Sequence, residues 1–350
     1  MKSALIIGAG ISGLAAAKEL ARAGVRASIL DKGRGVGGRM ATRRIATNYG
    51  EAKADHGAQY LTSRHSPRFA ATLRGLEETG DIAIWEHTPT HKREGAEKVE
   101  PRFIAPEGMT APAKALAQGL DTTLGERAVE LHFFIREGKA VWRVVTDKGS
   151  VFEADALLLT SPTPQTLDLL NTAPEPLLSA EERRALEAVR YAPCIAVMLA
   201  LAPTKSAPVF QRSSHVSALQ WATGNVAKGV RADVESLTAH LNADFSHKHW
   251  ETPESDLLPL VWRELRAALA AEEANLLPED VVATSVHRWK YSRVIEPFGE
   301  LFFALQSPLI PPCVLAGDAF ARSASAEEPA RVEDAALSGW AAAEYLLSLR

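Results

Sequence analysis

The sequence predicts an α/β fold in two domains, one built on a parallel sheet and a second of mixed α+β type. Residues 3–8 form a short, continuously apolar run that ends in glycine, which is typical of a parallel strand buried on both faces. A helical pattern over residues 11–23 and a second apolar run over residues 25–31 follow it, which makes a βαβ unit. The length of 350 residues suits two domains of ordinary size.

Composition and charge narrow the functional class. The hydrophobic fraction of 46% and the charged fraction of 23% are those of a globular protein, and a net charge of -4 gives no electrostatic reason to expect a nucleic-acid partner or an anionic membrane surface. The two cysteines, Cys194 and Cys313, have no metal-ligand spacing, so we expect no metal site or disulfide framework. No signal peptide or membrane helix is expected, and a cytoplasmic location fits best.

The turn after the first strand carries the spacing G-x-G-x-x-G at Gly8, Gly10 and Gly13. The first glycine permits a tight turn, the second lets backbone approach a pyrophosphate, and the third lets helix and strand pack closely. The helix start supplies free N–H groups and a positive dipole end for the anion. Asp31 ends the next strand, where its carboxylate can accept hydrogen bonds from an adenosine ribose. The first domain is therefore predicted to be a Rossmann-like dinucleotide-binding domain.

A second glycine-rich loop at residues 33–38 indicates which dinucleotide is bound, NAD or FAD. It follows Asp31 directly and leads into Arg39, and a simple NAD domain has no use for it. FAD is longer and needs a second close backbone approach with a fixed cation, so we expect FAD. Arg43 and Arg44 in the same stretch are interpreted instead as part of a solvated basic turn.

The rest of the chain divides into recognisable elements. Residues 108–120 look helical, and residues 128–162 read as three short strands around two turns, leading into a buried strand at 156–159. The middle of the chain mixes helices and strands without a glycine-rich phosphate loop. Its expected helices cover 179–190 and 256–271, and its expected strands cover 194–201 and 216–223.

Nucleotide features thus gather at the two ends of the chain. We expect a discontinuous FAD-binding domain, a parallel sheet plus a three-stranded β-meander, made of residues 1–65, 104–175 and 285–350. Residues 66–103 and 176–284 are expected to form the second, α+β, substrate domain.

The C-terminal segment also suits a flavin. Residues 311–323 read as a strand running into a loop, and Asp318, directly after Gly317, is placed to accept hydrogen bonds from ribityl hydroxyls. A closing helix begins near Val332, and its positive N-terminus would stabilise negative charge at the N1/C2 carbonyl edge of a reduced flavin. Glu333 in its first turn could cap that helix or touch the flavin, and the sequence leaves both open. A surface helix capped by an aspartate loop is the alternative for the segment.

The chain resembles a known family at these motifs. The stretches "GAGISGL" and "LDKGRGVGGRMATRR" look like those of the FAD-binding amine-oxidase and renalase superfamily, and "ADHGAQYLTSR" is similar to its loop under the flavin ring. The segments "HRWKYSR", "VLAGDAF" and "RVEDAALSGWAAAEYL" resemble the end of renalase-type enzymes. The resemblance implies a fold like that of p-hydroxybenzoate hydroxylase and the amine oxidases.

Residues and resemblance together give a set of candidate FAD contacts. Those that rest on the resemblance are the flavin loop, the segment after the buried strand at 156–159, and a backbone contact to adenine. The complete set is Gly8, Gly10, Ile11, Ser12, Gly13, Asp31, Lys32, Gly38, Arg39, Met40, Gly57, Ala58, Gln59, Tyr60, Val129, Thr160, Pro162, Gly317, Asp318, Val332 and Glu333.

Hydride transfer to a flavin needs a substrate carbon held over the ring and no obligatory base. Candidate substrate-pocket residues are Tyr60, His287 and Trp289, with Tyr191 and Tyr291 also considered. The alternating aromatic residues of "HRWKYSR" also fit one face of a buried strand, and His287 alone also fits a structural histidine. No Ser/His/Asp, Cys/His or paired-carboxylate arrangement stands out.

The resemblance implies renalase-type chemistry, in which isomeric dihydronicotinamide dinucleotides are oxidised and dioxygen reoxidises the flavin to give hydrogen peroxide. Cys313 lies outside the position at which amine-oxidase relatives tether flavin, so we expect non-covalent FAD. The alternatives are an oxidase of amines or similar small substrates, an aromatic monooxygenase, and a non-catalytic binding protein that keeps the fold. The expected partners are the small substrate and O2, in a monomer or homodimer.

Overall fold

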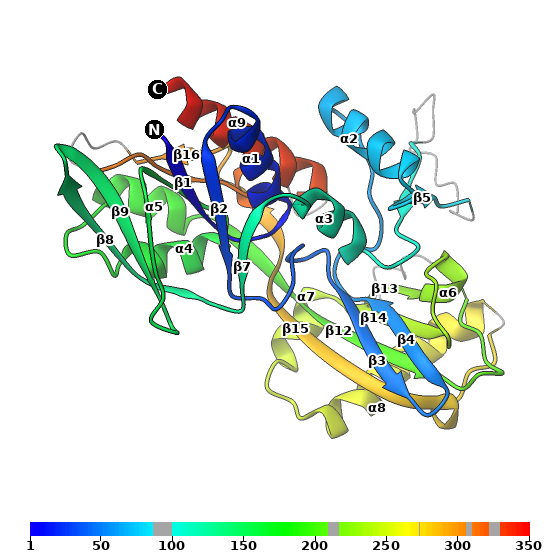
Figure 1. Ribbon diagram of the computed structural model, residues 1–350. Helices are drawn as coiled ribbons and strands as arrows, with labels where there is room; N and C mark the ends of the chain where they lie inside the picture. Colours follow the sequence, from blue (N-terminus) through cyan, green and yellow to red (C-terminus); the bar gives the residue numbers. More distant parts are fainter. Residues whose placement is uncertain (87–99, 209–216, 273, 306–309, 322–329) are drawn as a thin grey trace. The chain divides into compact units, whose positions relative to one another are not determined.

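A computed structural model describes residues 1–86, 100–208, 217–272, 274–305, 310–321 and 330–350 (Figure 1). Parts of the expected domain segments 66–103, 176–284 and 285–350, and Val216 of the expected strand 216–223, lie outside the described residues. The chain forms two compact units. Unit 1 comprises Met1–Gly38, Ala113–Tyr191 and Arg293–Arg350, and unit 2 comprises Arg39–Pro112 and Ala192–Ser292.

Unit 1 contains the predicted parallel sheet. Its six strands are ordered β16-β17-β11-β1-β2-β7, and only the edge strand β16 runs antiparallel. The central strand is buried along its whole length, as its continuous apolar run predicts. The strand bounds are β1 Ser3–Ile7, β2 Arg26–Asp31, β7 Asp121–Leu124, β11 Ala156–Leu159, β16 Phe303–Ala304 and β17 Cys313–Leu315.

The helices of unit 1 include the one that follows the glycine turn. Helices α1 (Ile11–Arg22) and α9 (Val332–Ser348), from opposite ends of the chain, lie side by side (Figure 1). Helices α3 (Thr110–Ala117, which continues from unit 2), α4 (Thr163–Leu170) and α5 (Ala180–Glu187) connect other strands. An exposed serine-glutamate capping box, formed by Ser179 and Glu182, begins α5.

The expected β-meander is also present in unit 1. Strands β8 (Ala128–Arg136), β9 (Lys139–Thr146) and β10 (Val151–Ala154) pair antiparallel in the order β10-β9-β8. Its core side chain is Trp142, which is fully buried and donates its indole N–H to the backbone carbonyls of Pro311 and Pro312, both at 3.1 Å.

Unit 2 is built on a four-stranded sheet in the order β13-β14-β12-β15. The long helix α8 packs its apolar residues into a core with the sheet. The hairpin β3–β4 packs against Met198 and Ala200 of β12 in a second apolar core, and β5 pairs with β6. The bounds are β3 Thr42–Thr47, β4 Gly50–Asp55, α2 Pro67–Glu78, β5 Ala83–Ile84, β6 Phe103–Ile104, β12 Arg190–Leu201, β13 Leu219–Gly224, α6 Asn225–Lys228, β14 Ser236–Leu241, α7 Ala243–Lys248, α8 Glu254–Ala271 and β15 Val281–Glu296.

The fold class is α/β with a Rossmann-like parallel sheet, a β-meander and a second α+β part, as predicted. The two units divide the chain elsewhere than expected. Residues 39–65 and 104–112, which the sequence places in the FAD-binding domain, pack within unit 2, because the β3–β4 hairpin shares an apolar core with Met198 and Ala200 and because Leu61 exchanges two backbone hydrogen bonds with Phe103. Residues 285–292 also belong to unit 2, and residues 176–191, expected in the substrate domain, belong to unit 1. Assigning cofactor binding and substrate binding to separate domains stays a prediction.

Candidate functional site

The glycine turn of unit 1 is held by Thr160. Its hydroxyl donates to the carbonyl oxygens of Ile7 (3.0 Å) and Gly8 (3.2 Å). Gly8 has φ +117°, and a Cβ there would collide with this hydroxyl. A Cβ on Gly13 would collide with the Gly8 carbonyl oxygen. Two of the three motif glycines thus serve close packing, and Thr160 supports the turn.

Gly10 differs from the other two, because a Cβ built on it would have no atom within 4 Å. The second glycine loop lies against it: Gly37 pairs with Gly10 in a parallel bridge and donates its N–H to Ala9 at 2.8 Å, and a Cβ on Gly38 would lie 3.5 Å from the Gly10 Cα. The two glycine loops of the sequence therefore form one backbone surface with open space at Gly10. This is the space that a pyrophosphate needs.

The start of α1 is ready to bind an anion. Its N-cap, Gly10, has no side chain that could accept a hydrogen bond from the first-turn N–H groups. Ser12 is 4% exposed, and its hydroxyl has no hydrogen-bond partner within the described part of the chain. Ile11, beside it, is buried. An open cradle and a helix N-terminus together fit the pyrophosphate of a dinucleotide.

The Asp31 carboxylate binds the backbone of both glycine loops. Its carboxylate accepts the N–H groups of Ala9 and Gly33, both at 2.6 Å. A carboxylate has about four lone-pair positions, so capacity for ribose hydroxyls remains. The neighbouring Lys32 reaches Gln165 at 3.0 Å on the surface.

Three further candidates of unit 1 are Val129 at a β-bulge, Pro162 at a helix N-cap and Tyr191 in strand β12. Val129 is the extra residue of a β-bulge between Ala128 and Glu130, which takes backbone groups out of the ladder. Pro162 is the N-cap of α4. Tyr191, considered for the substrate pocket, accepts the Thr163 N–H at 3.0 Å, so its hydroxyl has a structural role in unit 1.

The C-terminal candidates surround the start of α9. Gly317 has φ +132° and donates its N–H to the Ser338 hydroxyl at 2.8 Å, which ties the loop carrying the buried Asp318 to the helix. Val332 is the first residue of α9 and Glu333 is 2% exposed. The N-cap N–H, that of Arg331, is accepted by Asp334 at 2.7 Å. The contacts of Asp318 and Glu333 with a flavin stay predictions.

In unit 2 the structure brings two predicted segments together. Ala58 donates its N–H to the Arg39 carbonyl at 2.9 Å, and a Cβ on Gly57 would collide with the same oxygen. The Arg39 guanidinium reaches the carbonyls of Tyr291 (3.3 Å) and Ser292 (3.4 Å), and Met40 is buried. Residues 39–41 and 56–58 thus run side by side.

A buried ion pair lies behind this loop. Lys228 Nζ and Asp55 Oδ2 are 2.8 Å apart, and both side chains are 0% exposed. Lys228 also donates to the carbonyl (3.2 Å) and side-chain oxygen (3.3 Å) of Gln59. Asp55 Oδ1 accepts from the Thr42 hydroxyl and the Met109 N–H. Sequence reasoning missed Lys228, because nothing in "GNVAKGVR" distinguishes it from a surface lysine.

His287 and Trp289 do lie together, with ring centroids 4.1 Å apart, and they contact a histidine that sequence reasoning did not single out, His56. The Trp289 indole donates to the His56 carbonyl at 2.7 Å. Burial, helped by the positive charge of Arg43 and by His287, lowers the pKa of His56 to about 3, and burial likewise lowers that of His287. Both imidazoles are therefore neutral near pH 7.

Tyr60 belongs to a different cluster. Its ring lies 6.1 Å from Trp85 and 5.9 Å from Trp221, with the Arg102 guanidinium 4.6 Å over its face. The three candidate pocket residues are thus divided between two aromatic clusters, each within unit 2. Single tryptophans far apart in the sequence gave no signal for the second cluster.

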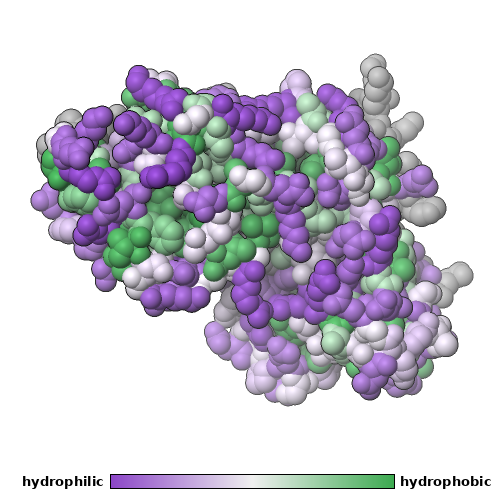
Figure 2. Space-filling view, in the orientation of Figure 1, coloured by the Kyte–Doolittle hydropathy of each residue, from purple (hydrophilic) through white to green (hydrophobic). Residues whose placement is uncertain are grey.

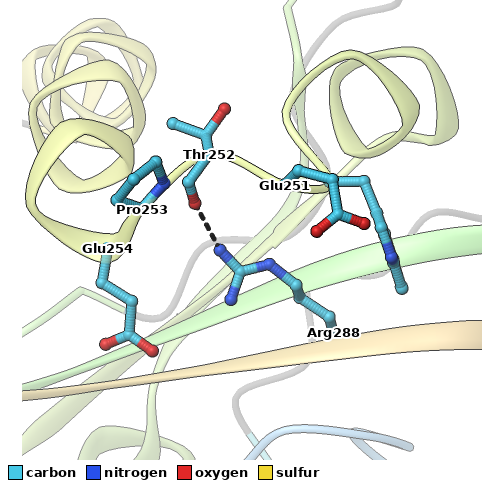
Figure 3. Close-up of a pocket in the computed structure, with 6 residues that line it drawn as sticks. Glu251, Thr252, Pro253, Glu254 and Arg288 are labelled. Atoms are coloured by element: carbon cyan, nitrogen blue, oxygen red, sulfur yellow. Dashed lines mark hydrogen bonds between the residues drawn. The ribbon is translucent and has the colours of Figure 1, made fainter.

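A surface cavity of about 330 Å³ lies at the start of α8 and contains none of the predicted site residues (Figure 3). Arg288, on β15, points into it and donates to the Thr252 carbonyl at 2.6 Å. Acidic side chains of Glu251 and Glu254 line it as well. Since neighbouring residues on a strand point to opposite faces, Arg288 and the His287–Trp289 pair face different sides of β15.

None of the helices in the described residues combines the length and the hydropathy needed to cross a bilayer. On the face in Figure 2, apolar residues are interspersed with hydrophilic ones.

Comparison with known proteins gives two family matches. A model described as flavin containing amine oxidoreductase matches residues 86–347, and one described as NAD(P)-binding Rossmann-like domain matches residues 6–76. The first covers well over half of the chain.

Individual relatives agree with these matches. Renalase from Mus musculus is 28% identical over 337 residues, which are 92% of this chain and 94% of that protein. (S)-6-hydroxynicotine oxidase from Paenarthrobacter nicotinovorans is 38% identical over 73 residues, 21% of this chain and 17% of that protein. Putrescine oxidase bound to putrescine shares the fold, with a TM-score of 0.64 at 15% identity and 99% of each chain covered.

Proposed function

Because the chain belongs to the flavin containing amine oxidoreductase family and is an FAD-dependent oxidoreductase, we propose that it is an oxidase of isomeric dihydronicotinamide dinucleotides. The observation that carries the substrate proposal is the similarity to renalase along 92% of the chain. Bound FAD supplies the two-electron acceptor, and dioxygen takes the electrons on with release of hydrogen peroxide.

Unit 1 would hold the nucleotide part of FAD. The α1 N-terminus with Ser12 binds the pyrophosphate over Gly10, and Asp31 accepts from the adenosine ribose. Asp318 accepts from the ribityl chain, and the positive end of α9 at Val332 stabilises negative charge on the flavin ring. Each of these residues binds or orients, and none needs to move a proton.

Unit 2 would contribute the groups around the reacting ring. The resemblance assigns the backbone of Gly57 and Ala58 a contact with the flavin, and the flat rings of Trp289 and Tyr60 would offer stacking surfaces to a planar substrate. His287 and His56 remain neutral, so they do not repel the positive charge that develops on a nicotinamide ring as it loses hydride.

We propose that FAD is bound non-covalently in a cytoplasmic protein. Cys313 lies fully buried in β17 and burial raises its thiol pKa, so it is a poor candidate for a tether. Whether the protein is a monomer or a homodimer stays a prediction.

Anaerobic stopped-flow mixing of the purified yellow protein with two-, four- and six-position dihydronicotinamide isomers tests the substrate. We expect rapid bleaching of the flavin absorbance by the two- and six-position isomers and slow bleaching by the four-position form. Fast bleaching by the four-position form would count against the proposal.

A second candidate is the oxidation of a small amine, which the family match and the fold of putrescine oxidase favour. A panel of amines in the same anaerobic assay separates the two candidates. A colourless protein that takes up no FAD would instead indicate a non-catalytic member of the fold.

A further inference from the structure

The ion pair of Lys228 and Asp55 is the most deeply buried charged group in the described residues of unit 2. Removing two charges from water is costly, and a buried pair often stabilises a fold less than apolar residues of the same volume. Global stability alone is therefore a weak reason for its presence. Its hydrogen bonds suggest a more local task.

The Lys228 ammonium and the Gln59 side-chain amide both donate to one short segment, residues 55–59. Lys228 Nζ donates to the Gln59 backbone carbonyl and to its Oε1, so the ammonium fixes which end of the amide faces it. The other end, Nε2, then donates to the carbonyls of Asp55 (2.6 Å) and Gly57 (3.2 Å). Residues 55–59 are thus closed into a loop around the Lys228 ammonium.

The far side of the network is fixed to the rest of unit 2. The Asp55 N–H donates to Asn225 Oδ1 at 3.0 Å, and Asn225 Nδ2 donates to the Ser236 carbonyl and the Thr238 hydroxyl. Lys228 ends α6, which Asn225 begins. The loop therefore takes its position from the β4–α6 framework through charged and neutral hydrogen bonds with no exposed member.

We propose that Lys228 is a positioning residue for the flavin: through Gln59 it holds the backbone of residues 56–58 in the conformation that contacts the isoalloxazine ring. The proposal rests on the proposed function, because it is FAD that the loop is positioned to meet. Lys228 acts through the loop and does not itself touch the ring.

The test uses a variant that removes the charge pair without leaving a lone charge. Lys228→Met alone would bury an unpaired carboxylate and destabilise the fold. In the double variant Asp55→Asn/Lys228→Met, an amide keeps the acceptor for Thr42 and Met109, and methionine keeps the volume of the lysine stem. We expect a melting temperature close to that of the wild type.

The readouts are FAD affinity, measured by titration of the apoprotein, and the visible spectrum of the bound flavin. In the double variant we expect the Kd for FAD to rise on the order of tenfold and the flavin bands to shift. The matched control is Lys53→Met. Lys53 is on β4, as Asp55 is, and its Nζ forms an ion pair of similar length with Glu107 (2.7 Å), but it makes no hydrogen bond to residues 56–59 in the described residues. It should leave affinity and spectrum unchanged.

A double variant with wild-type melting, wild-type Kd and an unshifted spectrum would show that the pair is structural only, and would overturn the proposal. If the double variant does not fold, Gln59→Met decides, because it keeps the ion pair and removes the amide contacts: weaker FAD binding at unchanged melting supports the proposal, and unchanged binding overturns it. Wild-type protein that takes up no FAD would instead refute the proposed function itself.

Discussion

The three glycines of the first turn have different tasks, although the sequence motif treats them as one pattern. Gly8 and Gly13 are required because the Thr160 hydroxyl and the Gly8 carbonyl occupy the positions of their missing side chains. Gly10 has an ordinary backbone conformation, φ -74° and ψ 175°, and open space beside it. The fold itself therefore tolerates a side chain at Gly10, and we expect that bound FAD would not.

Alanine substitutions separate these tasks. We expect Gly10→Ala to change the free energy of unfolding of the apoprotein by less than about 1 kcal/mol but to raise the Kd for FAD about tenfold or more, since the methyl group enters the pyrophosphate space. Gly13→Ala should cost about 1–3 kcal/mol of apoprotein stability through overpacking. Urea unfolding and FAD titration measure the two effects; equal losses of stability in both variants would refute this division.

At the scale of elements, helices from the two ends of the chain meet through backbone. A Cβ on Gly339 of α9 would collide with the carbonyl oxygen of Ser12 in the first turn of α1. The helix that closes the chain thus sets the position of the helix that we expect to bind the pyrophosphate. A small residue is needed at the contact because the two helix backbones approach so closely.

The variant Gly339→Ala should force the helices apart. We expect a loss of about 1–3 kcal/mol in stability together with weaker FAD binding, because Ser12 moves with α1. Gly75→Ala on α2 is the matched control, since its Cβ would meet nothing within 4 Å. It should stabilise the protein by about 0.4–1 kcal/mol and leave FAD binding unchanged. Thermal melting with FAD titration measures both; Gly339→Ala protein with wild-type stability would contradict the close contact.

At the scale of the whole molecule, buried ionisable groups make stability depend on pH. His56 is 5% exposed and stays neutral in the folded protein down to about pH 3, whereas the same side chain in the unfolded chain takes up a proton near its ordinary pKa of 6.5. Between these values the unfolded state binds more protons, so stability falls as the pH decreases.

We therefore expect acidification to destabilise the wild type more than a His56→Leu variant. Each pH unit of unequal protonation corresponds to about 1.4 kcal/mol, so between pH 7 and pH 4.5 the wild type should lose about 2–3 kcal/mol more than the variant. Urea unfolding at both pH values measures this, and the exposed His132→Gln serves as control. Carboxylates common to all three proteins cancel in the comparison; equal losses in wild type and His56→Leu would show that His56 is accessible to protons in the folded state.

Much of this molecule could be predicted from local pattern. Local signals predicted the βαβ unit, the meander, the helices near residues 180 and 256 and the last helix from Val332. Apolar periodicity, turn glycines and helix caps each depend on residues that are close together in the sequence. The parallel sheet and the family followed from the same motifs.

The sequence by itself determined that a glycine-rich turn between a parallel strand and a helix begins the Rossmann-like sheet and that a helix begins at Val332, because both signals lie within a few consecutive residues. Their contacts with FAD stay predictions. Only the tertiary structure decided that Gly10 alone of its motif faces open space, that His56 joins His287 and Trp289, and that Lys228 holds Gln59. Burial and pairing across 169 residues, as between Lys228 and Gln59, depend on which strands and helices pack together, and no local pattern of residue types records that.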